Sequence, residues 1–142
     1  MIDVSSLTSQ LRAVVQAQPK QLKGDVVILR YDGSGPYVSP PIAMARWNAL
    51  HVRVVPPSGT NISATVRVQG SFGGGAGADL SDPNAVVTNV TTPTTLDVVV
   101  GTLWATVRLE NVVGTPDPGQ AWRIEATPYV AAAQSRQVAT VL

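Results

Sequence analysis

The chain has 142 residues, of which 44% are hydrophobic and only 13% are charged, and its formal net charge is +1. This length suits one domain with a substantial core, and the near-neutral charge argues against nucleic-acid binding. The absence of cysteine excludes disulfides and thiolate metal sites. No apolar run approaches the roughly 20 residues of a membrane span. The first residues lack the parts of a signal peptide, so we expect a product made in the cytoplasm.

The first part of the chain has a helical pattern. Within residues 4–18, Val4, Leu7 and Leu11 recur at three- and four-residue spacing, and Pro19 follows as a stop signal. This spacing predicts a short amphipathic helix. An extended arm is the alternative, because Ser, Thr and Val lower helix propensity. With the linker that follows, residues 1–24 form an N-terminal helix or arm.

The remaining residues, 25–142, have the composition and periodicity of a β domain. Valine is the most frequent residue of the chain, and 12 Gly and 11 Pro supply turn signals. Polar and apolar residues alternate strictly in 62–69 and 103–110, as in strands with one buried face. The sequence therefore predicts a single antiparallel β-sandwich, either jelly-roll-like or immunoglobulin-like. The expected strands are 26–31, 42–45, 50–54, 62–69, 86–90, 96–100, 103–110, 122–127 and 137–141.

One strand pairing is predicted in detail. If residues 103–110 and 121–129 form a hairpin, one register brings opposite charges together on one face and apolar residues on the other. In this register Arg108 lies opposite Glu125, and Glu110 lies opposite Arg123.

The search for chemistry finds no catalytic, cofactor or metal site. His51, the single histidine, falls on the polar face of a strand without an acid nearby in the sequence, which indicates a solvent-facing or interface residue. Asp79 and Asp82 are a weak calcium candidate, and a turn or capping role is favoured over it. The glycine run 73–77 lacks the Lys-Ser/Thr of a phosphate-binding loop and is interpreted as a mobile loop.

The arginine and tryptophan residues indicate interaction surfaces rather than catalytic sites. Four arginines lie on polar strand faces, where ion pairs across the sheet or contacts between subunits are expected. They are Arg53, Arg67, Arg108 and Arg123. Trp104 falls on a polar face and is a candidate platform for a sugar ring, whereas Trp122 is expected in the core. The low charge has two explanations: a surface partly covered by partners, or a neutral polar surface.

Three stretches, 65–74, 103–109 and 122–128, resemble the small β-sandwich proteins of tailed-phage virions over roughly residues 48–130. A glycine run replaces the Asp-Gly and Trp that such proteins carry in the turn, and residues 1–24 have no counterpart in them. This resemblance implies a virion structural protein, specifically a head decoration (cement) protein that binds the major capsid protein or other virion proteins.

The same resemblance leaves other functions open and implies which partners the protein has. A tail, collar or head–tail accessory protein is the alternative within this class, and a carbohydrate-binding sandwich is the alternative from another class. We expect a homo-oligomer, with a trimer favoured, and neither nucleic acid nor membrane as a partner. Residues 1–24 and loops 32–41 and 70–84 are the expected contact elements. The candidate interaction residues are Val4, Leu7, Leu11, Tyr37, Phe72 and Trp104.

Overall fold

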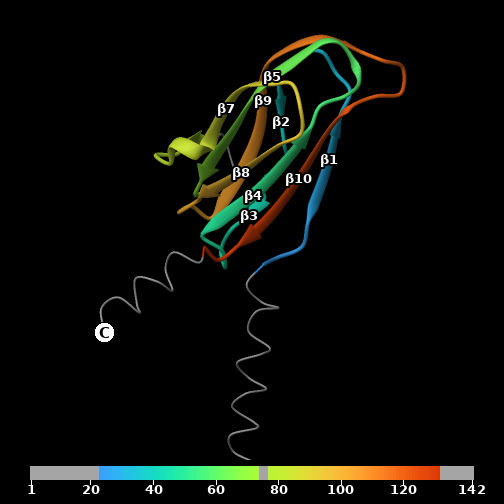
Figure 1. Cartoon of the computed structure of the whole chain (residues 1–142). Coiled ribbons are helices and arrows are strands. Elements are labelled where there is room, and N and C mark those ends of the chain that lie inside the picture. Colours follow the sequence, from blue (N-terminus) through green and yellow to red (C-terminus); the bar gives the residue numbers. More distant parts are fainter. Residues whose placement is uncertain (1–22, 74–76, 132–142) are drawn as a thin grey trace, which may run out of the picture.

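The computed structural model describes residues 23–73 and 77–131, which form two packed antiparallel sheets (Figure 1). This confirms the predicted all-β sandwich. The expected helix within 4–18 and the expected strand 137–141 lie outside the described residues. The elements are β1 (Val27–Tyr31), β2 (Tyr37–Val38), β3 (Ile42–Ala43), β4 (Ala49–Val55), β5 (Gly59–Ser71), β6 (Ala78–Asp79), the 3₁₀ turn η2 (Pro83–Ala85), β7 (Val86–Val90), β8 (Thr94–Val99), β9 (Trp104–Pro116) and β10 (Trp122–Tyr129).

The topology is that of a jelly roll. One sheet has the order β1-β10-β4-β8, and the other has β2-β9-β5-β6, with β3 also on β9 and β7 also on β5. The chain thus pairs from its ends inward: β1 with β10, β2 and β3 with β9, β4 with β8, and β5 with β7. This rolled-up hairpin is the jelly-roll arrangement and decides between the two sandwich types expected from the sequence.

The core lies between the two sheets and follows from the alternation in the strands. In β4, β10 and the core-facing parts of β5 and β9, alternate residues such as Val66 and Val68 are buried between the sheets. Trp122, the largest fully buried side chain, is 1% exposed, as expected from its apolar position. The other largest fully buried side chains are Met44, Leu50, Leu109, Ile124, Val52, Val54, Val66, Val68, Val90, Val98 and Val100.

The predicted hairpin between 103–110 and 121–129 is wrong. β9 and β10 lie in opposite sheets, where β9 pairs with β5 and β10 pairs with β1 and β4. Glu125 therefore lies opposite Arg53 of β4, not opposite Arg108. In a jelly roll the connection between the last two strands crosses from one sheet to the other, so neighbouring strands in sequence need not pair.

The strands themselves match the expected segments with two kinds of difference. β5 and β9 have 13 residues each, longer than predicted, because their pairing continues beyond the core to Gly59 opposite Pro116. The two-residue strands β2 and β6 were not expected, since they fall in the predicted loops 32–41 and 70–84. Strands this short carry almost no periodicity of their own.

Candidate functional site

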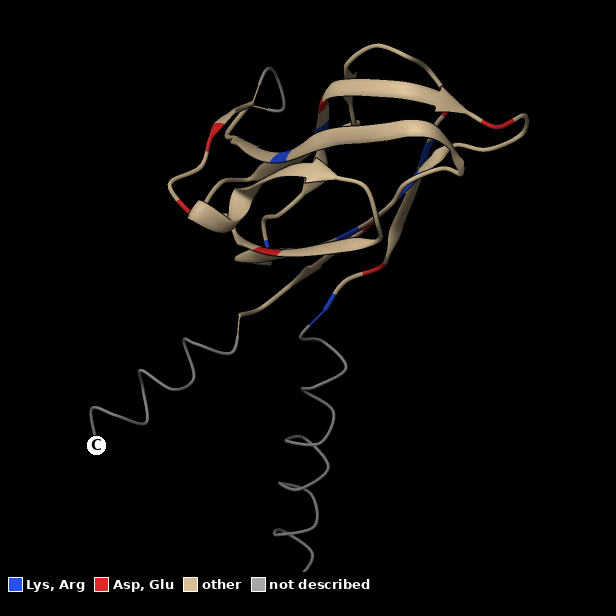
Figure 2. Ribbon diagram, turned by 45° about the horizontal axis from the view of Figure 1, so that its top comes forward, with Lys and Arg blue, Asp and Glu red and all other residues tan. Residues whose placement is uncertain are grey.

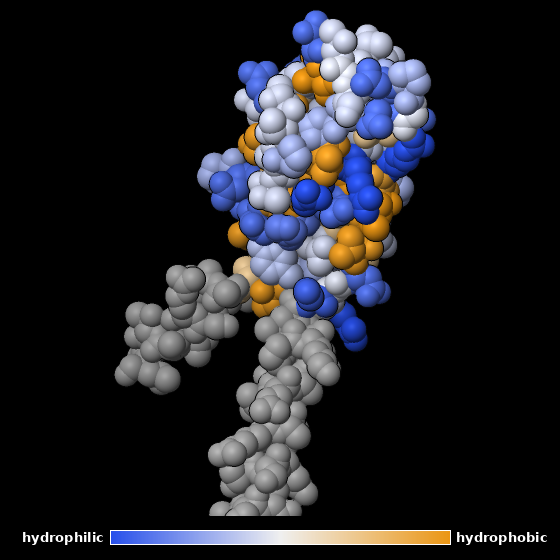
Figure 3. Space-filling model, turned by 45° about the vertical axis from the view of Figure 1, so that its right-hand side comes forward, coloured by the Kyte–Doolittle hydropathy of each residue, from blue (hydrophilic) through white to orange (hydrophobic). Residues whose placement is uncertain are grey.

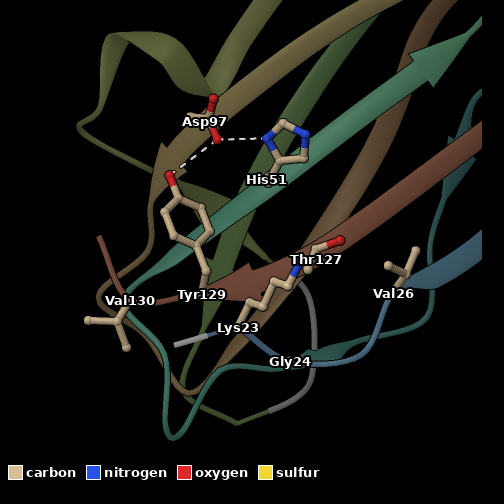
Figure 4. A pocket seen from close by; sticks show the side chains of 8 residues that line it. All are labelled: Lys23, Gly24, Val26, His51, Asp97, Thr127, Tyr129 and Val130. Atoms are coloured by element: carbon tan, nitrogen blue, oxygen red, sulfur yellow. Dashed lines mark hydrogen bonds and ion pairs between the residues drawn. The ribbon is translucent and has the colours of Figure 1, made fainter. Parts of the chain in front are cut away.

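A depression of about 730 Å³ lies on the outer face of the β1-β10-β4-β8 sheet, at the end where β10 finishes (Figure 4). The buried residues Leu50 and Val52 flank His51 on β4, so strand alternation directs His51 outward. The register then places Thr127 of β10 on one side of His51 and Asp97 of β8 on the other. The lining residues are Lys23, Gly24, Val26, His51, Asp97, Thr127, Tyr129 and Val130.

Asp97 organises the polar side of this depression. Its Oδ1 accepts hydrogen bonds from His51 Nδ1 at 2.8 Å and from the Tyr129 hydroxyl at 3.2 Å, and Figure 4 shows both rings turned toward the carboxylate. Because a carboxylate only accepts, Nδ1 of His51 is the donor in this hydrogen bond. Burial, and then the negative charge of Asp97, raise the pKa of the Tyr129 phenol, which keeps it protonated and donating.

The arrangement offers hydrogen bonds beside an apolar surface. Val26 and Val130 contribute apolar lining, while the side chains of Asp97 and His51 present polar groups to solvent. The Tyr129 hydroxyl donates to Asp97, so three strands contribute polar side chains to one hydrogen-bonded cluster. Hydrogen-bonding groups beside an apolar surface are typical of ligand pockets.

Acidic residues elsewhere are used within the fold. No group of three or more potential ligands that could hold a metal ion occurs in residues 23–73 and 77–131. Of the weak calcium pair, Asp79 accepts hydrogen bonds from Gln69 at 2.9 Å and Arg67 at 3.5 Å. Asp82 caps η2 by accepting from the Asn84 N–H at 2.9 Å. The capping role expected for Asp82 is confirmed.

Figure 2 shows Lys and Arg interspersed with Asp and Glu along the ribbon of the described residues. On the outer sheet faces they pair: Arg67 Nε lies 2.7 Å from Glu110 Oε1, and Arg123 Nε lies 2.9 Å from Glu125 Oε1. Arg53 is 4.0 Å from the second oxygen of Glu125. Three of the four strand arginines form ion pairs as expected. Arg108 does not form one among the described residues, and it donates to Gln69 instead.

The residues singled out from the sequence do not line the depression. Val4, Leu7 and Leu11 lie outside the described residues. Tyr37 is half-buried on β2, with its ring centroid 4.8 Å from that of Tyr31. Phe72, 69% exposed, directly follows Ser71, which lies opposite the half-buried Trp104. The structure thus brings Phe72 and Trp104 to one end of the β5–β9 ladder and sets Tyr37 farther along β9, opposite Leu109.

Sequence reasoning missed the contact between His51 and Asp97. Buried residues flank both His51 and Asp97 in their strands, so both side chains lie on the outer face of the sheet. The missing information was that β4 pairs with β8, a long-range pairing that makes the two residues direct neighbours. The expectation that His51 faces solvent is confirmed, since its side chain is 43% exposed.

The described residues contain no helix long and apolar enough to cross a membrane. No protein-family model matches the sequence, and no curated protein matches it. Among solved structures, the crystal structure of the SPBc2 prophage-derived protein YomS is similar in fold. The TM-score is 0.51 at 15% sequence identity, and the alignment covers 73% of this chain and 92% of YomS. This likeness shows that nearly all of YomS shares the sandwich architecture described above.

Proposed function

We propose that this chain is a structural protein of a bacteriophage virion, and specifically a head decoration protein that binds the capsid lattice. The observation that carries the proposal is the fold shared with a prophage-derived protein over 92% of that protein. The jelly-roll topology adds support, because viral capsid proteins use it repeatedly. The resemblance of residues 65–74, 103–109 and 122–128 to tailed-phage sandwiches points the same way.

On this proposal the protein acts without catalysis. It stabilises the capsid by bridging neighbouring copies of the major capsid protein, so that separating them requires breaking additional contacts. Burial of apolar surface supplies about 25 cal/mol per Å² to such contacts. Exposed apolar residues at the ends of the sandwich, such as Phe72 and Leu103, are available for this role.

The proposed contact elements are residues 1–24 and loops 32–41 and 70–84. Lys23 pairs with Tyr129 in an isolated bridge, so the described part of the chain begins beside the end of β10. The apolar spacing of Val4, Leu7 and Leu11 suits an arm that packs onto a capsid subunit. A tail, collar or head–tail location would use the same kinds of contact.

The test is binding to particles of the phage that encodes the chain. We expect the 14.8 kDa chain in purified particles, and gold labelling of an added tag on heads rather than tails. Protein lacking residues 1–20 should no longer sediment with particles from which the native protein has been removed. Its near-UV circular dichroism, which reports the packed core around Trp122, should stay unchanged. Retained binding would refute the role of the arm, and absence of the chain from particles would refute the virion role.

A second function, carbohydrate binding, is favoured by the depression rather than by Trp104. The Tyr129 ring, Asp97 and His51 there combine a partly apolar surface with hydrogen-bonding groups, which suits a sugar ring. Trp104 is only half-exposed and lies opposite Ala43 of β3. A glycan screen with the intact protein and the Asp97→Asn variant tests this function: binding lost in the variant supports it, and no binding by the intact protein counts against it.

A further inference from the structure

The sandwich has four sheet edges, and three of them carry features that hinder pairing with another strand. At the edge of β8, the carboxylate of Asp82 accepts from the Val99 N–H at 2.8 Å, and η2 packs beside the strand. Along β9, the outer strands β2 and β3 have two residues each and are separated by Pro40 and Pro41. Along β5, the edge is divided between the two-residue strand β6 and the strand β7, whose pairing with β5 contains a register shift. Such features protect edges from association.

The edge of β1 has none of these features. β1 is a regular five-residue strand without proline, and among the described residues only β10 pairs with it along its length. Its outward-facing residue Ile28 is 58% exposed, and Val26, just before the strand, is 53% exposed. Figure 3, which turns this side of the molecule forward, shows hydrophobic surface among polar residues. Val26 also borders the 730 Å³ depression, and Ile28 borders one of about 250 Å³.

We propose that β1 pairs in antiparallel fashion with β1 of a second copy of this chain. The two four-stranded sheets then join into one continuous sheet across a two-fold axis. In an edge strand, alternate residues direct their N–H and C=O groups away from the existing partner, so these groups are available to the second copy. The pairing satisfies them and covers the two exposed apolar side chains.

The spacing of the two side chains fixes the register. Antiparallel pairing keeps outward residues opposite outward residues. In the register that centres on Val27, Val26 of one copy lies opposite Ile28 of the other, and the reverse pair forms across the axis. All four exposed apolar side chains then meet. Moving the register by one step of two residues would instead place Val26 opposite Arg30 of the second copy.

A second copy is the occupant that these observations favour. The pattern is self-complementary about Val27, as a two-fold interface requires. A head-to-tail ring formed by strand pairing would need two different free edges on each subunit. Because the other three edges are protected, such a ring cannot form in this way. The inferred assembly is therefore a dimer, which departs from the trimer expected from the sequence. The inference rests on the described strands and does not depend on the virion role.

The first experiment measures the molar mass of the full chain by light scattering and sedimentation over a range of concentrations. We expect twice the 14.8 kDa of one chain for the wild type and one chain mass for Ile28→Lys. Val99→Lys is the matched control, because Val99 is also 58% exposed but lies at the protected edge of the same sheet; it should remain dimeric. A wild-type monomer, a dimeric Ile28→Lys variant or loss of the dimer in Val99→Lys would each overturn the proposal.

The second experiment tests the register and does not rely on a lysine variant that folds. The chain has no cysteine, so single cysteines can be introduced at positions 26 and 28. An oxidised mixture of Val26→Cys and Ile28→Cys chains should form a disulfide-linked dimer of the two different chains. Each variant alone should remain largely unlinked, because identical positions lie diagonally, about 7–8 Å apart. Equal cross-linking of one variant alone, or none in the mixture, would contradict the register.

Discussion

Arg67 on β5 and Glu110 on β9 form an ion pair across the ladder, with 2.7 Å between Nε and Oε1. The register places Arg67 directly opposite Arg108, an unfavourable pair of like charges. Glu110 lies one position further along on the same face and offsets this repulsion, and Gln69 accepts from Arg108 at 3.2 Å. The hydrogen bond from Arg67 to Glu110 raises the pKa of the guanidinium, so Arg67 stays charged.

Replacing Glu110 by Gln should therefore lower the free energy of unfolding by about 1 kcal/mol, because both side chains of the ion pair are about 30% exposed or less. Urea unfolding followed by tryptophan fluorescence measures the change. Asp117→Asn, in the exposed turn before β10, removes the same charge without a comparable contact and should change the free energy little. Equal effects of the two substitutions would show that the ion pair does not contribute.

Asp82 links η2 to β8 through two separate hydrogen bonds. One oxygen accepts from the Asn84 N–H at 2.9 Å and the other from the Val99 N–H at 2.8 Å. We expect Asp82→Ala to lower the free energy of unfolding by about 1–2 kcal/mol, as for loss of a helix cap. Asp82→Asn, which retains one acceptor oxygen, should have a smaller effect. The control Asp32→Ala changes an exposed turn residue and should be nearly neutral.

The fold was predictable where the signal is local. Alternation in segments such as 62–69 and 103–110 located the main strands and their buried faces, because side-chain direction repeats every two residues. Strand partners were not predictable in this way. The charges of Arg108 and Glu125 alone are compatible with a hairpin. In the structure, however, β9 and β10 belong to different sheets, on opposite sides of the core.

The candidate site shows the same limit. His51 and Asp97 are 46 residues apart, and nothing between them indicates that β4 and β8 are neighbours. The role of Tyr129 is still harder to predict from the sequence, because Tyr129 contacts Asp97 from a third strand, β10. A site assembled from three strands becomes visible only when the sheet order is known.

Gly114 in β9 has a conformation that a side chain would oppose. Its φ is +95°, and a Cβ there would clash with the backbone oxygen of Asn61. We expect Gly114→Ala to lower the free energy of unfolding by at least about 1–2 kcal/mol, the cost of a left-handed conformation alone. Gly35→Ala is the control, since a Cβ at that position meets nothing within 4 Å. Thermal unfolding of the two variants compares them, and similar melting temperatures would contradict the expectation.

Tyr129 should make stability depend on alkaline pH. Burial and Asp97 raise the pKa of its phenol in the folded protein above the ordinary value of about 10. The contribution of the protonated Tyr129 phenol to the free energy of unfolding is therefore fully present below pH 10. It is lost as the pH rises through the raised pKa of the folded state. Tyr37, whose pKa is raised by burial, contributes in the same direction.

The Tyr129→Phe variant separates this effect from other titrating groups. It lacks both the hydrogen bond to Asp97 and the ionisable hydroxyl, so near pH 8 it should be less stable than the wild type by about 1 kcal/mol. Because only the wild type ionises at this position, the difference should shrink between pH 10 and 11. Free energies of unfolding measured from pH 8 to 11 test this, with Tyr37→Phe as the comparison. If the Tyr129→Phe and wild-type curves run parallel, the phenol is not coupled to folding.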